Sequence, residues 1–221
     1  MHLLVSPEIQ EKLWKFTTKT SYQSDYLLQP KERGKKIDLK KSFPEEIQNF
    51  VLELGSGWGE VAIELAKNDR QTGYLLMEKK VNRIIHTEKQ RQTLGLTNIR
   101  YMTVNFQWFF DELLEKEIFD EIIINFPDPW PKKKHRKNRL MQEHMLEQIY
   151  DLLKPGGKLL FATDYGPYAR RTISLFRKFP KFVWDKKEYE FERPGFPVSF
   201  FETEKRNEGK RIYYINRTKI K

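Results

Sequence analysis

Gly55, Gly57 and the preceding Glu53 form the first group of residues in the chain that suits a small-molecule site. Glycine lets the backbone turn tightly and approach a ligand without an intervening Cβ atom. The spacing is G-x-G-x-G, shorter than the G-x-G-x-x-G of dinucleotide-binding turns, and the sequence contains no P-loop motif. Glu53 would repel a pyrophosphate but attract a positively charged cofactor. The turn therefore favours S-adenosylmethionine over a dinucleotide.

Two polar residues follow later apolar runs and could complete such a site. Glu78 is placed to accept hydrogen bonds from both ribose hydroxyls of an adenosine cofactor, as acidic residues at the end of a second strand do in related folds. The alternative is a surface glutamate at a strand end. Asn105 either hydrogen-bonds the adenine edge or is an ordinary turn residue. We expect Glu78 to bind the cofactor and leave both readings of Asn105 open.

A second group of residues lies in the segment 125–131 (NFPDPWP), which runs directly into the basic segment 132–139 (KKKHRKNR). Prolines on both sides of Asp128 and Trp130 stiffen the loop, which reduces the entropy lost when a ligand binds. Asp128 could accept hydrogen bonds from N1–H and the 2-amino group of guanine, the donors that distinguish guanine from adenine. Trp130 either stacks on a base or, as we favour, packs under its own loop. The basic segment is either a solvated face or, as we expect after such a loop, a contact for phosphates flanking the base.

Composition narrows the class of protein. Lys and Arg number 41 against 31 Asp and Glu, which gives a net charge of +10. This excess favours a polyanion but does not choose among RNA, DNA and an acidic membrane surface, and a merely basic protein is the alternative. The absence of cysteine and the scattering of four histidines predict neither disulfides nor a metal site. With no apolar run long enough to span a membrane and no export signal at the N-terminus, we expect a cytoplasmic enzyme.

Hydrophobic periodicity predicts how these residues are positioned. Apolar runs alternate with amphipathic stretches, which is typical of βαβ units in a doubly wound, mostly parallel α/β sheet. The expected strands are 50–54, 73–78, 99–104, 119–125, 158–163, 182–191 and 211–216, and the expected helices are 60–67, 82–94, 108–116, 140–153 and 167–179. Right-handed crossovers bring the carboxyl ends of parallel strands to one edge, where such folds bind ligands. We expect residues 1–45 to form an N-terminal arm, either contacting RNA or flexible, and 46–221 to form one domain.

Taken together, these segments resemble the bacterial tRNA (guanine-N7-)-methyltransferase family. The resemblance is carried by ELGSGWG, the strand-end Glu78, NFPDPWPKKKHRKNRL and the later Thr163-Asp164, and it runs from about residue 50 to the C-terminus. It implies a seven-stranded class I methyltransferase sheet (Rossmann-like) with the last strand antiparallel. It also implies S-adenosylmethionine as methyl donor and a guanine in the variable loop of tRNA as target.

Site residues follow from the same resemblance, motif by motif. The implied cofactor-binding residues are Glu53, Gly55, Gly57, Glu78, Asn105 and Asp128, with Asp128 also the catalytic residue, and the implied substrate-binding residues are Lys132, Asp164, Ser199 and Glu202. The chain departs from the family pattern in three places. Asn105 stands where bacterial members often have Asp, Asn138 interrupts the basic run, and Ser199 replaces Thr with its hydroxyl retained. A monomer or homodimer acting on tRNA, without metal or membrane, is the expected form.

Guanine N7 carries a lone pair and no proton, so its methylation requires alignment rather than deprotonation. Asp128 is therefore expected to orient the base and offset the positive charge that develops on it. Three alternatives remain: a class I methyltransferase acting on another nucleobase or exocyclic amino group, a non-catalytic RNA-binding relative, and a nicotinamide-dependent dehydrogenase. A methyltransferase acting on exocyclic amino groups would carry [ND]-P-P-[FYW], which the loop only approximates. The intact glycines and Glu53 argue against a non-catalytic relative. The glycine spacing argues against a dehydrogenase.

Overall fold

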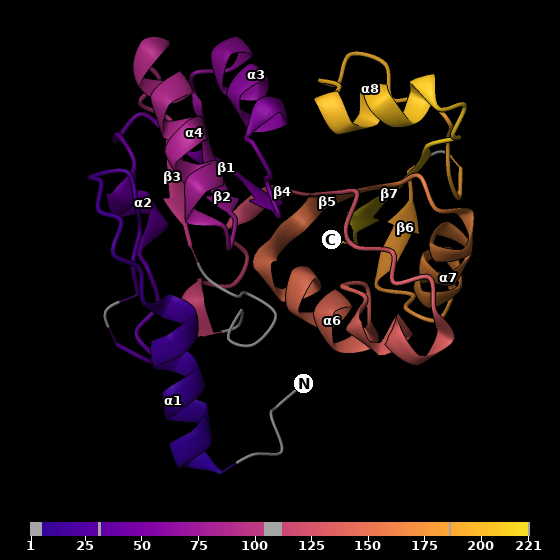
Figure 1. Ribbon diagram of the computed structural model, residues 1–221, viewed down its shortest axis with the longest axis horizontal. Coiled ribbons are helices and arrows are strands. Elements are labelled where there is room, and N and C mark those ends of the chain that lie inside the picture. The colour runs from indigo at the N-terminus through magenta and orange to yellow at the C-terminus, as the bar shows by residue number, and fades with distance from the viewer. Residues whose placement is uncertain (1–5, 31, 104–111, 186, 221) are drawn as a thin grey trace. The chain divides into compact units, whose positions relative to one another are not determined.

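The computed structural model describes residues 6–30, 32–103, 112–185 and 187–220. The chain divides into two compact units, residues 1–116 and 117–221, and the seven strands of its sheet are distributed between them (Figure 1). Asn105 and much of the helix expected over 108–116 lie outside the described residues. No helix among the described residues has the length and apolarity needed to cross a membrane.

The first unit contains the three strands β1 (Asn49–Leu54), β2 (Thr72–Met77) and β3 (Ile99–Met102). They are parallel and lie in the order β3-β2-β1. Helix α3 (Glu60–Asn68) connects β1 to β2, and α4 (Val81–Thr93) connects β2 to β3 (Figure 1). Both helices and all three strands were predicted, because their apolar runs are buried on both faces of a parallel sheet.

The N-terminal segment contributes α1 (Pro7–Thr18), α2 (Leu39–Ser42) and an additional pairing at the edge of β3. Tyr101 donates its main-chain N–H to the oxygen of Tyr26 at 2.9 Å, and Leu28 donates to the oxygen of Tyr101 at 2.8 Å. The ring of Tyr26 lies under the Arg91 guanidinium, 3.4 Å from the ring centroid. Residues 26–28 therefore cover an edge that would otherwise expose unpaired main-chain groups.

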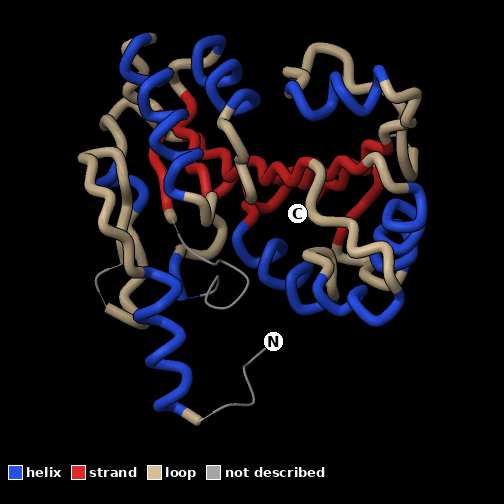
Figure 2. Tube along the Cα trace, in the orientation of Figure 1, coloured by secondary structure: helices blue, strands red, loops and turns tan. Residues whose placement is uncertain are grey.

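The second unit contains β4 (Phe119–Asn125), β5 (Leu153–Thr163), β6 (Phe182–Trp184) and β7 (Tyr213–Lys219). Their order is β4-β5-β7-β6; β4 and β5 are parallel, and β7 is antiparallel to both neighbours. The predicted antiparallel last strand is thus confirmed. The helices are the 3-10 helix η1 (Lys133–Asn138), α6 (Glu143–Leu152), α7 (Gly166–Arg177) and α8 (Phe200–Asn207), which Figure 2 shows around the strands.

Three details of this unit differ from the prediction. Residues 154–157, which lie before the expected strand 158–163, belong to β5, with an irregularity in the pairing between Phe119 and Glu121 of β4. Gly157 is needed there because a Cβ atom would lie 2.9 Å from the oxygen of Lys154. The strand expected over 182–191 ends at Trp184, with only an isolated bridge between Glu190 and Tyr214 beyond it. Helix α8 was not predicted at all.

Candidate active site

The glycine turn of the first unit leads from β1 into α3. Gly55, Gly57 and Gly59 have φ values of 76°, 59° and 78°, in the left-handed region that only glycine adopts at little cost. Gly55 donates its N–H to the oxygen of Met77 at 2.8 Å, which ties the turn to the end of β2. A Cβ atom at Gly59 would lie 2.2 Å from Cγ2 of Thr87 on α4, whereas Gly55 and Gly57 face open space. The third glycine therefore serves helix packing, and the first two leave room for a ligand.

Two buried carboxylates flank this turn. Glu53, near the end of β1, and Glu78, directly after β2, are each only 4% exposed. The Glu78 carboxylate accepts hydrogen bonds from the N–H of Gly57 at 3.2 Å and of Lys80 at 2.9 Å. Arg83 donates to it at 3.2 Å. Glu78 is therefore fixed in place, and its oxygens keep lone pairs for a further donor such as a ribose hydroxyl.

In the second unit, Asp128 lies on the loop that follows β4, and its side chain is exposed. The loop backbone is unusual on both sides of Asp128. Phe126 has φ 51° and Trp130 has φ 39°, and each stands directly before a proline. Left-handed conformations of non-glycine residues cost free energy and persist only where surrounding contacts enforce them. The loop is therefore held in one strained conformation that presents the Asp128 carboxylate to solvent.

Arg139 holds the far side of this loop. Its side chain is 5% exposed, and its Nε donates to the oxygen of Pro129 at 2.8 Å. The guanidinium lies over the ring of buried Tyr168, 4.8 Å from its centroid. Burial raises the pKa of Tyr168 to about 12, with Asp128 adding to the shift, so this ring stays neutral. Arg139 thus links the loop to the first turn of α7.

Two further contacts hold the loop. Trp130 lies parallel to His135 of η1, with the planes at 3° to each other and the centroids 5.8 Å apart, so the tryptophan has a partner within the protein. At the start of the loop, the side-chain oxygen of Asn125 accepts a hydrogen bond from Arg193 at 3.1 Å. Arg139 was predicted only as part of the basic segment 132–139, and Arg193 was not singled out from the sequence.

Asp164 follows the end of β5 as Asp128 follows the end of β4. Asn125 pairs with Ala162 in the parallel register, so the two aspartates come from the carboxyl ends of neighbouring strands. Asp164 also contributes to the raised pKa of Lys205 on α8, although the hydrogen bond from Lys205 to Glu208 is the larger cause. The structure thus brings Asp164 near α8, and Phe126 near Phe201 of the same helix, 5.1 Å between ring centroids.

Ser199 and Glu202 occupy the start of α8 and have structural partners. Ser199 is the N-cap, and its hydroxyl accepts a hydrogen bond from the N–H of Glu202 at 3.2 Å. The Glu202 carboxylate is 5% exposed and accepts hydrogen bonds from Arg206, at 3.0 Å, and from the Tyr214 hydroxyl. Burial raises the pKa of Tyr214 to about 12, so this hydroxyl remains a donor at neutral pH. A substrate-binding role for this pair rests on the family resemblance alone.

The predicted site residues therefore fall into two sets. Glu53, Gly55, Gly57 and Glu78 gather in the first unit; Asp128, Asp164, Ser199 and Glu202 gather in the second, and Lys132 is exposed directly before η1. Asn105 lies outside the described residues. Within the described ranges no group of three or more His, Cys, Asp or Glu side chains is arranged to hold a metal ion. The glycine turn, flanked by carboxylates, can bind a cationic adenosine cofactor. The exposed aspartate can accept hydrogen bonds from a donor.

Comparisons with known proteins show the family of this chain. The family described as "Putative methyltransferase" matches residues 47–215. The tRNA (guanine-N(7)-)-methyltransferase of Leptospira interrogans serovar Lai is 47% identical over 215 residues, which covers 96% of this chain and 98% of that protein. The protein of the same name from Rhizobium meliloti is 33% identical and covers 80% of this chain and 78% of its own.

Solved structures give the fold. The 16S rRNA methyltransferase KamB aligns with a TM-score of 0.62 at 13% identity, covering 85% of this chain and 95% of its own. An S-adenosylmethionine-dependent O-methyltransferase from Thermotoga maritima aligns with a TM-score of 0.53 at 15% identity, covering 99% of this chain and 67% of its own. Both likenesses show the class I methyltransferase fold and, at these identities, nothing about substrate.

Proposed function

This chain belongs to the tRNA (guanine-N(7)-)-methyltransferase family, and from that premise we propose that Asp128 holds the target guanine, in the variable loop of tRNA. The chain is an S-adenosylmethionine-dependent methyltransferase that modifies guanine N7 in tRNA. The role of each residue and the position of the guanine are the proposal. A tRNA substrate also favours a cytoplasmic location.

The cofactor is held in this proposal by Glu53, Gly55, Gly57 and Glu78, with Asn105 at the adenine edge. The residues present fit the group, because both glycines face open space and two carboxylates buried to 4% exposure flank them. S-adenosylmethionine supplies a methyl group already activated by its sulfonium. Glu53 attracts the positively charged end of the cofactor, and Glu78 accepts from the ribose hydroxyls.

Asp128 accepts hydrogen bonds from the Watson–Crick edge of guanine and leaves N7 free to react. Because N7 has no proton to lose, the carboxylate acts by orientation and by stabilising positive charge on the ring, and no general base is needed. The stiff loop supports this role, since a side chain fixed before binding loses little entropy on binding. Asp164 and Glu202 are secondary anchors for guanine or a neighbouring ribose, Ser199 caps the helix that carries Glu202, and Lys132 contacts the RNA.

One observation carries the assignment of Asp128: an exposed carboxylate on a strained, braced loop at the end of β4, in a chain 47% identical to a tRNA (guanine-N(7)-)-methyltransferase. The test is incubation with methyl-labelled S-adenosylmethionine and a tRNA transcript, followed by nucleoside analysis. A matched transcript with adenine in place of the variable-loop guanine is the control. We expect 7-methylguanosine from the first transcript only.

The other outcomes identify the alternatives. A label on another nucleoside, or on an exocyclic nitrogen, would support the other class I methyltransferase reading. Absence of S-adenosylmethionine binding by calorimetry would support a non-catalytic RNA-binding relative. Equal 7-methylguanosine from both transcripts would place the target outside the variable loop.

A further inference from the structure

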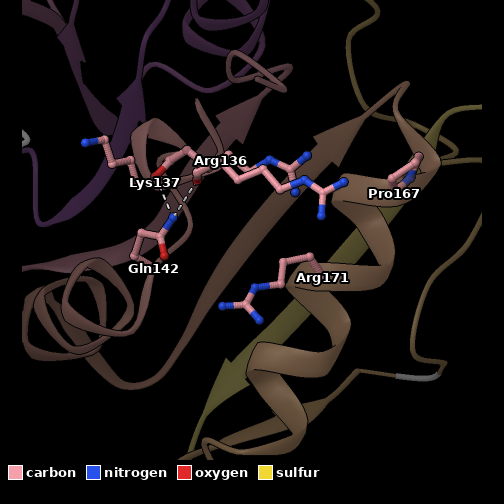
Figure 3. Close-up of a pocket in the computed structure, with 6 residues that line it drawn as sticks. Arg136, Lys137, Gln142, Pro167 and Arg171 are labelled. Atoms are coloured by element: carbon pink, nitrogen blue, oxygen red, sulfur yellow. Dashed lines mark hydrogen bonds between the residues drawn. The ribbon is translucent and has the colours of Figure 1, made fainter. Parts of the chain in front are cut away.

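A cavity of about 350 Å³ in the second unit has three arginines and a lysine among its six lining residues. Its wall consists of Arg136, Lys137, Arg139, Gln142, Pro167 and Arg171, which come from η1, from the start of α6 and from α7 (Figure 3). Arg136 and Arg139 belong to the basic segment after the Asp128 loop, but Arg171 lies on a different helix. No local feature of the sequence connects Arg171 to that segment.

In the described part of the chain, the three arginines of this cavity have no acidic partner. Among the described residues, no carboxylate forms an ion pair with Arg136, Arg139 or Arg171, although several exposed lysines and arginines elsewhere in the chain do have such partners. Arg139 is 5% exposed, and within the described residues it donates from Nε to the main-chain oxygen of Pro129 and from Nη2 to that of Trp130. Burial lowers the pKa of Arg139, and the neighbouring charges of Arg136 and Arg171 lower it further. A buried cation beside two like charges is costly unless an anion binds with them.

The shape of the cavity is fixed by neutral contacts. The side-chain nitrogen of Gln142 donates to the main-chain oxygens of Arg136, at 3.2 Å, and of Arg139, at 3.3 Å, as the dashed lines in Figure 3 show. Pro167, in the first turn of α7, completes the wall, so the positive end of that helix dipole adds to the field. Lys137 extends away from Arg171 in Figure 3. The arginines, more than the lysine, define the site.

We propose that this cavity binds one phosphodiester of the tRNA backbone next to the target guanine, with Arg171 as an anchor distinct from the basic segment. Guanidinium groups match the oxygens of a phosphate through paired hydrogen bonds. The location selects RNA as the source of the phosphate, because Arg139 also bonds to Pro129, the residue after Asp128. A phosphate held here lies beside the loop that holds the base. The inference rests on the proposed function for the identity of the nucleic acid.

Arg171→Gln tests the site, with Lys178→Gln as the matched control. Both residues are exposed cations at or near the same helix, but only Arg171 lines the cavity. Loss of one phosphate contact should reduce the magnitude of the slope of log K against log salt concentration by about 1 and raise Kd for tRNA by about tenfold. Lys178→Gln should change neither quantity beyond a small general effect of charge. Unfolding temperatures of both variants should equal that of the wild type, because neither side chain is buried.

A double-mutant cycle with Arg136→Gln adds a second measurement. If both arginines hold one phosphate, the double variant should lose clearly less affinity than the product of the two single losses. Equal effects of Arg171→Gln and Lys178→Gln, or an unchanged salt slope in Arg171→Gln, would overturn the proposal. Failure of the proposed function is distinguishable, because it appears as absence of 7-methylguanosine with the wild type, whereas the binding titration still reports on the cavity.

Discussion

Arg139 donates a hydrogen bond from Nε to the main-chain oxygen of Pro129 at 2.8 Å, and so a buried cation of the basic segment supports the residue next to Asp128. The same guanidinium lies over the Tyr168 ring, and the Tyr168 hydroxyl accepts from the N–H of Met141 at 3.0 Å. Loop, basic segment and α7 are therefore connected through one side chain. Arg139 can therefore act in two ways, through its positive charge and through the hydrogen-bond geometry of its guanidinium group.

Arg139→Lys keeps the charge and removes the fork-shaped donor. We expect kcat to fall about tenfold, because a lysine cannot reproduce the Nε–H bond to Pro129 and a displaced catalytic group loses effective alignment. The salt dependence of tRNA binding should remain close to that of the wild type, since the charge is retained. Steady-state kinetics and filter-binding titrations measure both. Arg177→Lys, an exposed arginine of α7, is the control; a drop in affinity without a drop in kcat would assign Arg139 to RNA binding alone.

Asp128→Asn should lower the rate of methyl transfer by roughly 10²- to 10³-fold, the usual effect of removing one electrostatic stabiliser of a transition state. The affinity for S-adenosylmethionine should change much less, since the carboxylates at the glycine turn are untouched. Single-turnover assays give the rate, and calorimetry gives the affinity. Turnover at the wild-type rate in this variant would refute the role given to Asp128.

Glu78→Gln preserves size but replaces one carboxylate oxygen by an amide nitrogen. We expect about tenfold weaker binding of S-adenosylmethionine, because a charged acceptor for the ribose is lost and the N–H groups of Gly57 and Lys80 lose part of their partner. The value of kcat at saturating cofactor should change little. Glu64→Gln on the exposed face of α3 is the matched control. If calorimetry gave equal affinities for the two variants, Glu78 would be structural only.

Gly59→Ala tests the packing of the turn against α4. The new Cβ atom would lie 2.2 Å from Thr87, and φ at this position is 78°. We expect a loss of about 3 kcal/mol in the free energy of unfolding, the sum of backbone strain and overpacking. Gly34→Ala isolates the strain, because Gly34 has φ 80° with no atom within 4 Å of the added methyl group, and should cost about 1 kcal/mol. Urea titration should show the larger loss for Gly59→Ala; equal losses would mean that α4 moves aside.

The sequence was sufficient to predict the parts of the fold that depend on hydrophobic runs. Ile122, Ile123 and Ile124 are fully or almost fully buried, and such a run between turns predicts a central parallel strand. The glycine turn was equally predictable, because its residues are chosen for the backbone conformation they adopt. The place of Glu78 at the end of a strand was predictable for the same reason, and its role in cofactor binding stays a prediction.

Other features depend on contacts between distant residues and were missed. Residues 182–191 were expected to form one strand, but the main-chain oxygen of Glu188 accepts a hydrogen bond from the side chain of the buried Arg217 at 2.9 Å. Helix α8 carried a recognisable signal, since Ser199 and Glu202 have the spacing of a capping box. The convergence of Arg139 and Arg171 on one cavity has no local signal, because it requires the folded arrangement of β4, β5 and α7.

Glu121 in β4 should make the folded protein less stable as pH rises. Burial raises the pKa of its carboxyl above the ordinary value of 4.5; Arg193 and Lys158 oppose this shift, and Asp185 adds to it. The folded protein therefore binds this proton more tightly than the unfolded chain, and the wild type loses stability as pH rises from the unfolded pKa through the folded one. Glu121→Gln carries no charge to desolvate, so at neutral pH it should be more stable than the wild type. The difference should vanish below about pH 4, where the wild-type carboxyl is protonated in both states. Urea unfolding at a series of pH values measures it, and a variant less stable than the wild type at neutral pH would show that the attraction of Arg193 and Lys158 for Glu121 outweighs the cost of its burial.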